Sequence, residues 1–282
     1  MKVLITGATG DVGSRVVRML IASGERPRVF VRDAAKADTL FGDRVDAFAG
    51  DLALPASLRP ALEGVDSLFL VSTGPAIPQL DAGVAEIAGQ AGIRHLVKLS
   101  SLDVEQGLAI GAWHEQGEAA VRASGVPYTF LRPSGFMLNL LAWTHSVRAE
   151  GVVRASTGEG RRPFIHSDDI AAVAVEALTS RAYVGQSLAL TGPEALTFGE
   201  ITQRVGLRIG RILRYEPISD DGAGERFRAT GASEPEVEAH VALWRAIREG
   251  RLGALTDSVE RVLGRPALNL DQWLSENGAA FL

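Results

Sequence analysis

Short apolar segments alternate with longer segments of helical periodicity over the first two thirds of the chain. Seven of the short segments have the length and apolar character of buried strands: residues 2–6, 28–32, 45–49, 66–72, 94–99, 126–131 and 186–191. Strands that are apolar along their whole length are typical of a parallel sheet that helices cover on both faces. The pattern therefore predicts an α/β fold with a doubly wound parallel sheet.

The pattern changes after Thr197. Thr197 with Glu200, and Ser233 with Glu236, have the spacing of capping boxes that open helices. The last third of the chain is therefore predicted to be mainly helical. We expect a Rossmann-type domain over residues 1–192 and a smaller, mainly helical C-terminal lobe over residues 193–282, which packs on the first domain and closes a substrate pocket.

The first predicted strand leads directly into glycines at positions 7, 10 and 13 and then into an amphipathic helix. Gly7 permits a tight turn, Gly10 leaves room for a phosphate, and Gly13 allows close packing of the helix on the sheet. The same spacing occurs in ordinary strand-to-helix turns, but its place between a strand and a helix start favours a dinucleotide pyrophosphate site. The predicted contacts are Gly7, Thr9, Gly10, Asp11, Val12 and Gly13.

The end of the second predicted strand carries the signal for cofactor choice. At about 20 residues past the glycine loop, an acidic residue binds the ribose 2′-hydroxyl of NAD, whereas an arginine accommodates the 2′-phosphate of NADP. Arg32 lies there, and Lys36 is close enough in sequence to help it bind phosphate. Two alternatives stay open, a solvated Arg32 and a strand that ends one residue later, at Asp33. We expect NADP(H) to be favoured over NAD(H).

Small polar residues follow the next predicted strands. Asp51 and Leu52 end the third strand, and Ser72 and Thr73 end the fourth. In an open α/β sheet the carboxyl ends of the strands line the crevice that holds the ligand. We therefore expect these four residues to contact the cofactor.

Composition excludes several functions. The chain has 282 residues, a formal net charge of −5 and no cysteine, which argues against nucleic-acid binding and excludes disulfides and cysteine–zinc sites. His114-Glu115-x-x-Glu118 lacks the second histidine of a zinc helix, so we expect no metal. No segment is long and apolar enough to span a membrane, and the first strand begins at Val3, so we expect a cytoplasmic protein.

The same motifs resemble the NmrA-like atypical short-chain dehydrogenase/reductases. The resemblance rests on residues 7–13, 31–33, 50–52, 98–101, 114–118, 124–133, 164–171 and 264–266, and it spans nearly the whole chain. That group includes NADPH-dependent quinone and azo reductases, isoflavone-type reductases and redox-sensing proteins with little or no catalysis. The resemblance implies a Rossmann fold that binds NADP(H), and it implies that Ser100 and Pro133 also contact the cofactor.

The chain departs from the larger superfamily at the catalytic pair. Short-chain dehydrogenases exchange a proton with a carbonyl through a Tyr-x-x-x-Lys pair, and this chain has none. By similarity, His114 falls at the lysine position and Ile110 at the tyrosine position. With an ordinary pKa near ~6.5, His114 is the candidate proton donor that titrates near neutrality. A purely structural histidine is the alternative.

The segment after the sixth predicted strand supplies candidate pocket residues. Phe136 and Met137 are candidate walls for a flat apolar substrate, and Asn139 resembles a family position near the pocket. Ordinary core packing is the alternative for the two apolar side chains. Downstream, Asp168 or Asp169 precedes an apolar helical run and is interpreted as a helix N-cap.

Two function classes remain. The first is an NADPH-dependent reductase that transfers hydride to a quinone or another conjugated carbonyl compound, in secondary metabolism, where orientation of the reactants matters more than a tyrosine acid. The alternative is a catalytically weak NADP(H)-sensing regulatory protein that acts through a protein partner. The pocket lobe and His114 favour the enzyme and a small-molecule substrate. A homodimer and a protein partner stay open.

Overall fold

The computed structural model describes residues 1–282, and its contacts divide the chain into two compact units. The sheet unit comprises residues 1–104, 111–133 and 167–189. The helical unit comprises residues 105–110, 134–166 and 190–282. The division therefore differs from the single boundary expected at residue 192, because residues 134–166 belong with the C-terminal third.

All seven predicted strands are confirmed, and they form one sheet in the order β3-β2-β1-β4-β5-β6-β9. Neighbouring strands from β3 to β6 pair in parallel. This is the strand order of a doubly wound Rossmann sheet. The strands are β1 (Val3–Thr6), β2 (Arg28–Val31), β3 (Asp46–Ala49), β4 (Ser67–Leu70), β5 (His95–Leu99), β6 (Tyr128–Pro133) and β9 (Ser187–Leu190).

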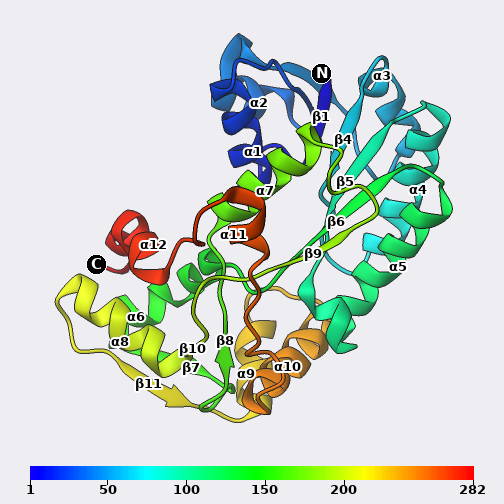
Figure 1. Cartoon of the computed structure of the whole chain (residues 1–282). Coiled ribbons are helices and arrows are strands. Elements are labelled where there is room, and N and C mark those ends of the chain that lie inside the picture. The colour runs from blue at the N-terminus through cyan, green and yellow to red at the C-terminus, as the bar shows by residue number, and fades with distance from the viewer. The chain divides into compact units, whose positions relative to one another are not determined.

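Helices cover both faces of this sheet (Figure 1). The helices of the sheet unit are α1 (Asp11–Ala22), α2 (Ala34–Phe41), α3 (Arg59–Leu62), α4 (Ile77–Gln90), α5 (Ala109–Ala123) and α7 (Ser167–Thr179). Helices α3, α4 and α5 bury apolar side chains against one face, where Leu4, Leu68, Leu96 and Phe130 belong to one core. Helices α1 and α7 pack against each other on the opposite face. None of the chain's helices has the length and apolar character that crossing a bilayer requires.

The helical unit contains two small sheets and six helices. Strand β7 (Val152–Ala155) pairs in parallel with β11 (Arg214–Pro217), and β8 (Arg161–Arg162) pairs antiparallel with β10 (Leu196–Thr197). The helices are α6 (Thr144–Glu150), α8 (Phe198–Ile209), α9 (Asp220–Arg228), α10 (Glu234–Arg248), α11 (Ser258–Leu263) and α12 (Leu270–Asn277). Both predicted capping boxes are confirmed, at the starts of α8 and α10.

The glycines of the first loop let α1 approach the end of β1 closely. Gly7 has φ +60°, a conformation that favours glycine, and the Gly10 amide donates to the Gly7 carbonyl over 2.9 Å. A Cβ at Gly13 would lie 2.2 Å from the Gly7 oxygen, and one at Gly7 would lie 2.9 Å from Val71 Cβ. The start of α1 is therefore fixed against the sheet by two positions that admit no side chain.

Replacing Gly13 by alanine should destabilise the fold. Although alanine favours a helix over glycine by about 1 kcal/mol, its Cβ would collide with backbone, and overpacking of this kind costs about 1–3 kcal/mol. The matched control is Gly199→Ala in α8, where the nearest atom to the new Cβ is 3.6 Å away. Thermal or urea unfolding should show a loss for Gly13→Ala and no loss for Gly199→Ala. Equal stability of the two variants would contradict the packing argument.

Candidate functional site

The parallel sheet brings most of the sequence-predicted cofactor residues to one edge. Hydrogen bonds tie neighbouring strand ends together there: Val71 N donates to Thr6 Oγ1 over 2.8 Å, and Gly50 N to the Val31 oxygen over 2.9 Å. Because β3, β2, β1, β4, β5 and β6 are neighbours in this order and pair in parallel, their carboxyl ends lie at the same edge of the sheet, as the fold requires of a ligand crevice. This edge carries Arg32, Asp51, Leu52, Ser72, Thr73, Ser100, Pro133 and the glycine loop.

The glycine loop forms an open cradle at the start of α1. Gly10 is the N-cap in an extended conformation (φ −84°, ψ 178°), and no side chain caps the helix. The first-turn amides are therefore available to an external acceptor. Within 4 Å of a Cβ at Gly10 there would be a single atom, the Gly7 oxygen at 3.2 Å. Free amides at a helix N-terminus beside an exposed glycine fit a phosphate group, and thus the pyrophosphate of a dinucleotide.

The Asp11 side chain binds residues where α1 and α7 meet. Its carboxylate accepts from Arg15 Nε over 3.0 Å and from the Ser167 hydroxyl, and Arg15 also pairs with Asp168. The backbone of Asp11 remains in the uncapped first turn, so a cofactor contact there would use its amide.

The interpretation of Asp168 or Asp169 as the N-cap is wrong, because α7 begins at Ser167 and both residues lie inside its first turn.

The structure places Arg32 directly after β2, with its side chain exposed and without an ion pair. Asp33 is the N-cap of α2 and accepts from the Lys36 amide over 3.2 Å. The carboxylate that competes with Arg32 for the ribose position thus has a role in the fold. The Lys36 side chain is also exposed, in the first turn of α2.

The predicted residues after β3 and β4 differ in how free their side chains are. Asp51 Oδ1 accepts from the Ala53 amide over 2.9 Å, and Leu52 packs against the core. Ser72 is buried and donates to Asp81 Oδ1 over 2.6 Å. Thr73 is exposed. Their contacts with a cofactor stay predictions.

Ser100 belongs to a buried network around Glu118 of α5. The carboxylate accepts from Ser100 Oγ over 2.7 Å and binds the Arg132 guanidinium through both oxygens, over 2.9 and 2.6 Å. Burial opposes ionisation of Glu118, but the hydrogen bonds from Arg132 and Ser100 prevail and hold the pKa of this carboxyl below its usual range. The network fixes α5 to the carboxyl ends of β5 and β6, where Pro133 is also buried.

His114 lies on the inner side of α5, with 9% of its surface exposed. Burial first, and the positive charge of Lys98 second, lower the pKa of its imidazole to about 3. The expectation of a histidine that titrates near neutrality is therefore wrong, since a pKa this low leaves the ring neutral at pH 7. Any part that His114 plays in catalysis has to be played by a neutral ring.

The three candidate pocket residues of the helical unit differ in accessibility. Met137 is 1% exposed and belongs to the unit's core, so core packing, the alternative reading, describes its side chain. Phe136 is half-buried and forms a bridge with Ile165, whereas Asn139 is exposed. Pocket roles for Phe136 and Asn139 stay predictions.

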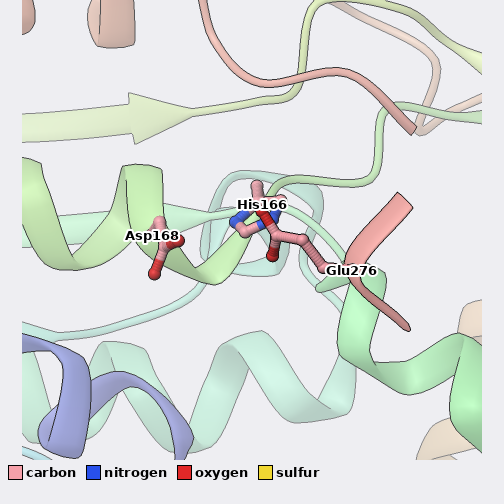
Figure 2. A group of neighbouring side chains, drawn as sticks. All are labelled: His166, Asp168 and Glu276. Atoms are coloured by element: carbon pink, nitrogen blue, oxygen red, sulfur yellow. The ribbon is translucent and has the colours of Figure 1, made fainter. Parts of the chain in front are cut away.

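His166 and Glu276 form a polar pair within the helical unit. Figure 2 shows the Glu276 side chain directed toward the imidazole, and His166 Nε2 lies 3.5 Å from a carboxylate oxygen of Glu276. His166 is fully buried, whereas about half of the Glu276 side chain is exposed. The two side chains form an ion pair when the imidazole is protonated.

Sequence reasoning missed the buried ion pair of Lys98 and Asp81, whose Nζ and Oδ2 lie 2.5 Å apart with both side chains fully buried. A signal was present, because Lys98 interrupts an apolar strand, and a buried lysine needs a partner. The partner was not identifiable, because Asp81 lies 17 positions away in a helix with several other polar residues.

Comparison with known proteins shows the family to which the chain belongs. A family model described as NAD(P)H-binding matches residues 7–181. A (4-alkanoyl-5-oxo-2,5-dihydrofuran-3-yl)methyl phosphate reductase of Streptomyces griseus is 39% identical, and an NAD(P)H azoreductase of Xenophilus azovorans is 35% identical. Each match covers 99% of both chains.

The fold agrees with solved structures as well. An NADPH-dependent quinone oxidoreductase of Escherichia coli superimposes with a TM-score of 0.89 at 24% identity, covering 97% of this chain and 99% of that one. By the family match and the two relatives, the chain belongs to the NAD(P)H-binding family and is an oxidoreductase of its NmrA-like, atypical short-chain dehydrogenase/reductase group.

Proposed function

We propose that the protein uses NADPH to reduce a quinone or another conjugated carbonyl compound. The observation that carries the cofactor half of the proposal is the open cradle at Gly10, where uncapped helix amides face an exposed glycine. The exposed Arg32 and Lys36, at the end of the neighbouring strand β2, supply positive charge suited to a 2′-phosphate.

The substrate half of the proposal rests on what the relatives' names have in common. One name describes an unsaturated lactone with an acyl substituent, one an azo compound and one a quinone. Each is an electron-poor conjugated system that accepts a hydride and leaves the electron pair on oxygen or nitrogen. That shared chemistry supports a conjugated acceptor as the substrate of this chain.

The residues at the sheet edge have separate tasks in this reaction. The amides of α1 hold the pyrophosphate, Arg32 and Lys36 hold the 2′-phosphate, and the bound cofactor supplies the hydride. The negative charge that the substrate gains needs hydrogen-bond donors more than a strong acid, because conjugation already spreads it. A neutral His114 is such a donor, and water then protonates the product anion.

Turnover is the direct test of the proposal. NADPH oxidation should proceed with a panel of quinones and unsaturated lactones and should be slow or absent with saturated ketones, which cannot delocalise the added electron pair. NADPH binding measured by calorimetry in parallel shows whether the nucleotide site is intact. Tight NADPH binding without turnover of any acceptor would contradict the proposed reaction and favour a nucleotide sensor.

Replacing Gly10 by valine should weaken NADPH binding selectively. The branched side chain would occupy the open side of the cradle, and losing even one amide hydrogen bond to a charged phosphate costs about 1.5–3 kcal/mol, or about tenfold or more in affinity. The fold should survive, because the backbone at Gly10 is extended and its Cβ would meet a single atom, the Gly7 oxygen at 3.2 Å, which has to give by a few tenths of an ångström. An unchanged NADPH titration in calorimetry would show that the pyrophosphate binds elsewhere.

Arg32→Ala should remove the preference for NADPH over NADH. Loss of a hydrogen bond to a charged group, about 1.5–3 kcal/mol, predicts a roughly 10- to 100-fold weaker NADPH complex and almost unchanged NADH affinity. Arg94→Ala is the matched control, because it removes an exposed arginine just before β5, at the opposite edge of the sheet. An equal loss for both cofactors would mean that Arg32 supports the fold or the adenine instead.

A further inference from the structure

Lys98 is a fully buried lysine in the middle of the parallel sheet. Side chains alternate along a strand, and its neighbour Leu96 packs in the core under α4 and α5, so Lys98 leaves β5 on that same face. There its ammonium meets Asp81 of α4 at 2.5 Å, and Asp81 also accepts from Ser72 over 2.6 Å. The proposed reaction does not use Lys98 or Asp81.

Helix α5 is shaped to approach the pair. A Cβ at Gly117 would lie 2.1 Å from Asp81 Oδ2, so only glycine lets α5 come this close to α4. One turn earlier on α5, His114 presents its Nδ1 to Lys98 Nζ at 3.5 Å. The lysine ammonium therefore lies between a carboxylate and an imidazole, all three within the sheet unit.

The chemistry of the lysine ammonium decides which nitrogen of the His114 ring carries the proton. A lysine ammonium has donors and no acceptor, so a neutral imidazole can face it only with an unprotonated Nδ1, and the ring proton then lies on Nε2. Nε2 has no partner within the protein, and the residue keeps 9% of its surface exposed.

No other charge near His114 opposes this arrangement. Glu118, one turn further along α5, is neutralised by Arg132 and Arg122, and Glu115 is exposed. Of the charged groups around the ring, Lys98 is the one that faces it directly.

We infer that the Asp81–Lys98 ion pair is a positioning pair that holds His114 as the neutral Nε2–H tautomer, a fixed hydrogen-bond donor for an oxygen of the bound ligand. The tautomer follows from the contacts of the sheet unit alone. The identity of the ligand oxygen rests on the proposed function, in which it is a substrate carbonyl or a ribose hydroxyl. No proton leaves His114 in this role, so the residue acts by orientation and charge stabilisation.

The inference is tested by the ring nitrogens of the protein without cofactor or substrate. Nitrogen-15 labelling of the five histidines, with His114→Gln to assign the signal, reports the protonation of each ring nitrogen. His95 is a built-in reference, because its Nε2 lies 2.9 Å from Thr129 Oγ1, whose own proton goes to the Tyr183 oxygen. We expect His114 to give the Nε2–H pattern of His95 at pH 7. An imidazolium or an Nδ1–H ring would overturn the inference.

The role of the pair is tested by Lys98→Met combined with Asp81→Asn. These replacements keep the side-chain shapes and leave no buried charge without its partner, which a single replacement would do at a large cost in stability. We expect His114 to become a mixture of tautomers, with a pKa higher than in the wild type, while the His95 signal stays unchanged and reports an intact β5.

A His114 signal identical to that of the wild type, in a folded double variant, would overturn the positioning role. If the double variant does not fold, the wild-type spectrum still decides the tautomer of His114. Because neither measurement uses NADPH or a quinone, a failure of the proposed reaction leaves the result unaffected.

Discussion

The approach of α1 to the end of β1 is the contact on which the candidate site depends. A side chain at Gly13 would strike the Gly7 carbonyl, and a side chain at Gly7 would strike Val71 of the neighbouring strand end. Because both are absent, the first turn of α1 lies at the carboxyl edge with its amides uncapped. The helix dipole and the free donors then attract an anion to the place where the strand ends converge.

Buried charge organises the other side of the same edge. Asp81 with Lys98, and Glu118 with Arg132, link α4 and α5 to β5 and β6. Pairs of this kind contribute little net stability compared with apolar packing, but removing one partner is strongly destabilising because it leaves a buried charge unpaired. They therefore favour the one arrangement of the elements in which both partners meet. The position and the neutral state of His114 are consequences of that arrangement, which explains why a histidine in this place does not titrate near neutrality.

The sequence was sufficient to predict the seven strands, the glycine loop and both capping boxes, because each depends on a local pattern of residues. It was not sufficient for features that depend on contacts between distant segments. The assignment of residues 134–166 to the helical unit depends partly on the pairing of β7 with β11, about 60 positions further on. The lowered pKa of His114 depends first on its burial and second on Lys98, and no helical or strand periodicity connects Lys98 to it.

The most direct test of the nucleotide site is to follow backbone amide signals of the 15N-labelled protein while NADPH is added. The account predicts the largest shifts in the amides of residues 10–13 and of the segment that follows β2, because the first turn of α1 is uncapped and Arg32 is exposed at the neighbouring strand end. Shifts that leave the start of α1 unchanged would contradict the account, since they would place the cofactor away from the glycine loop.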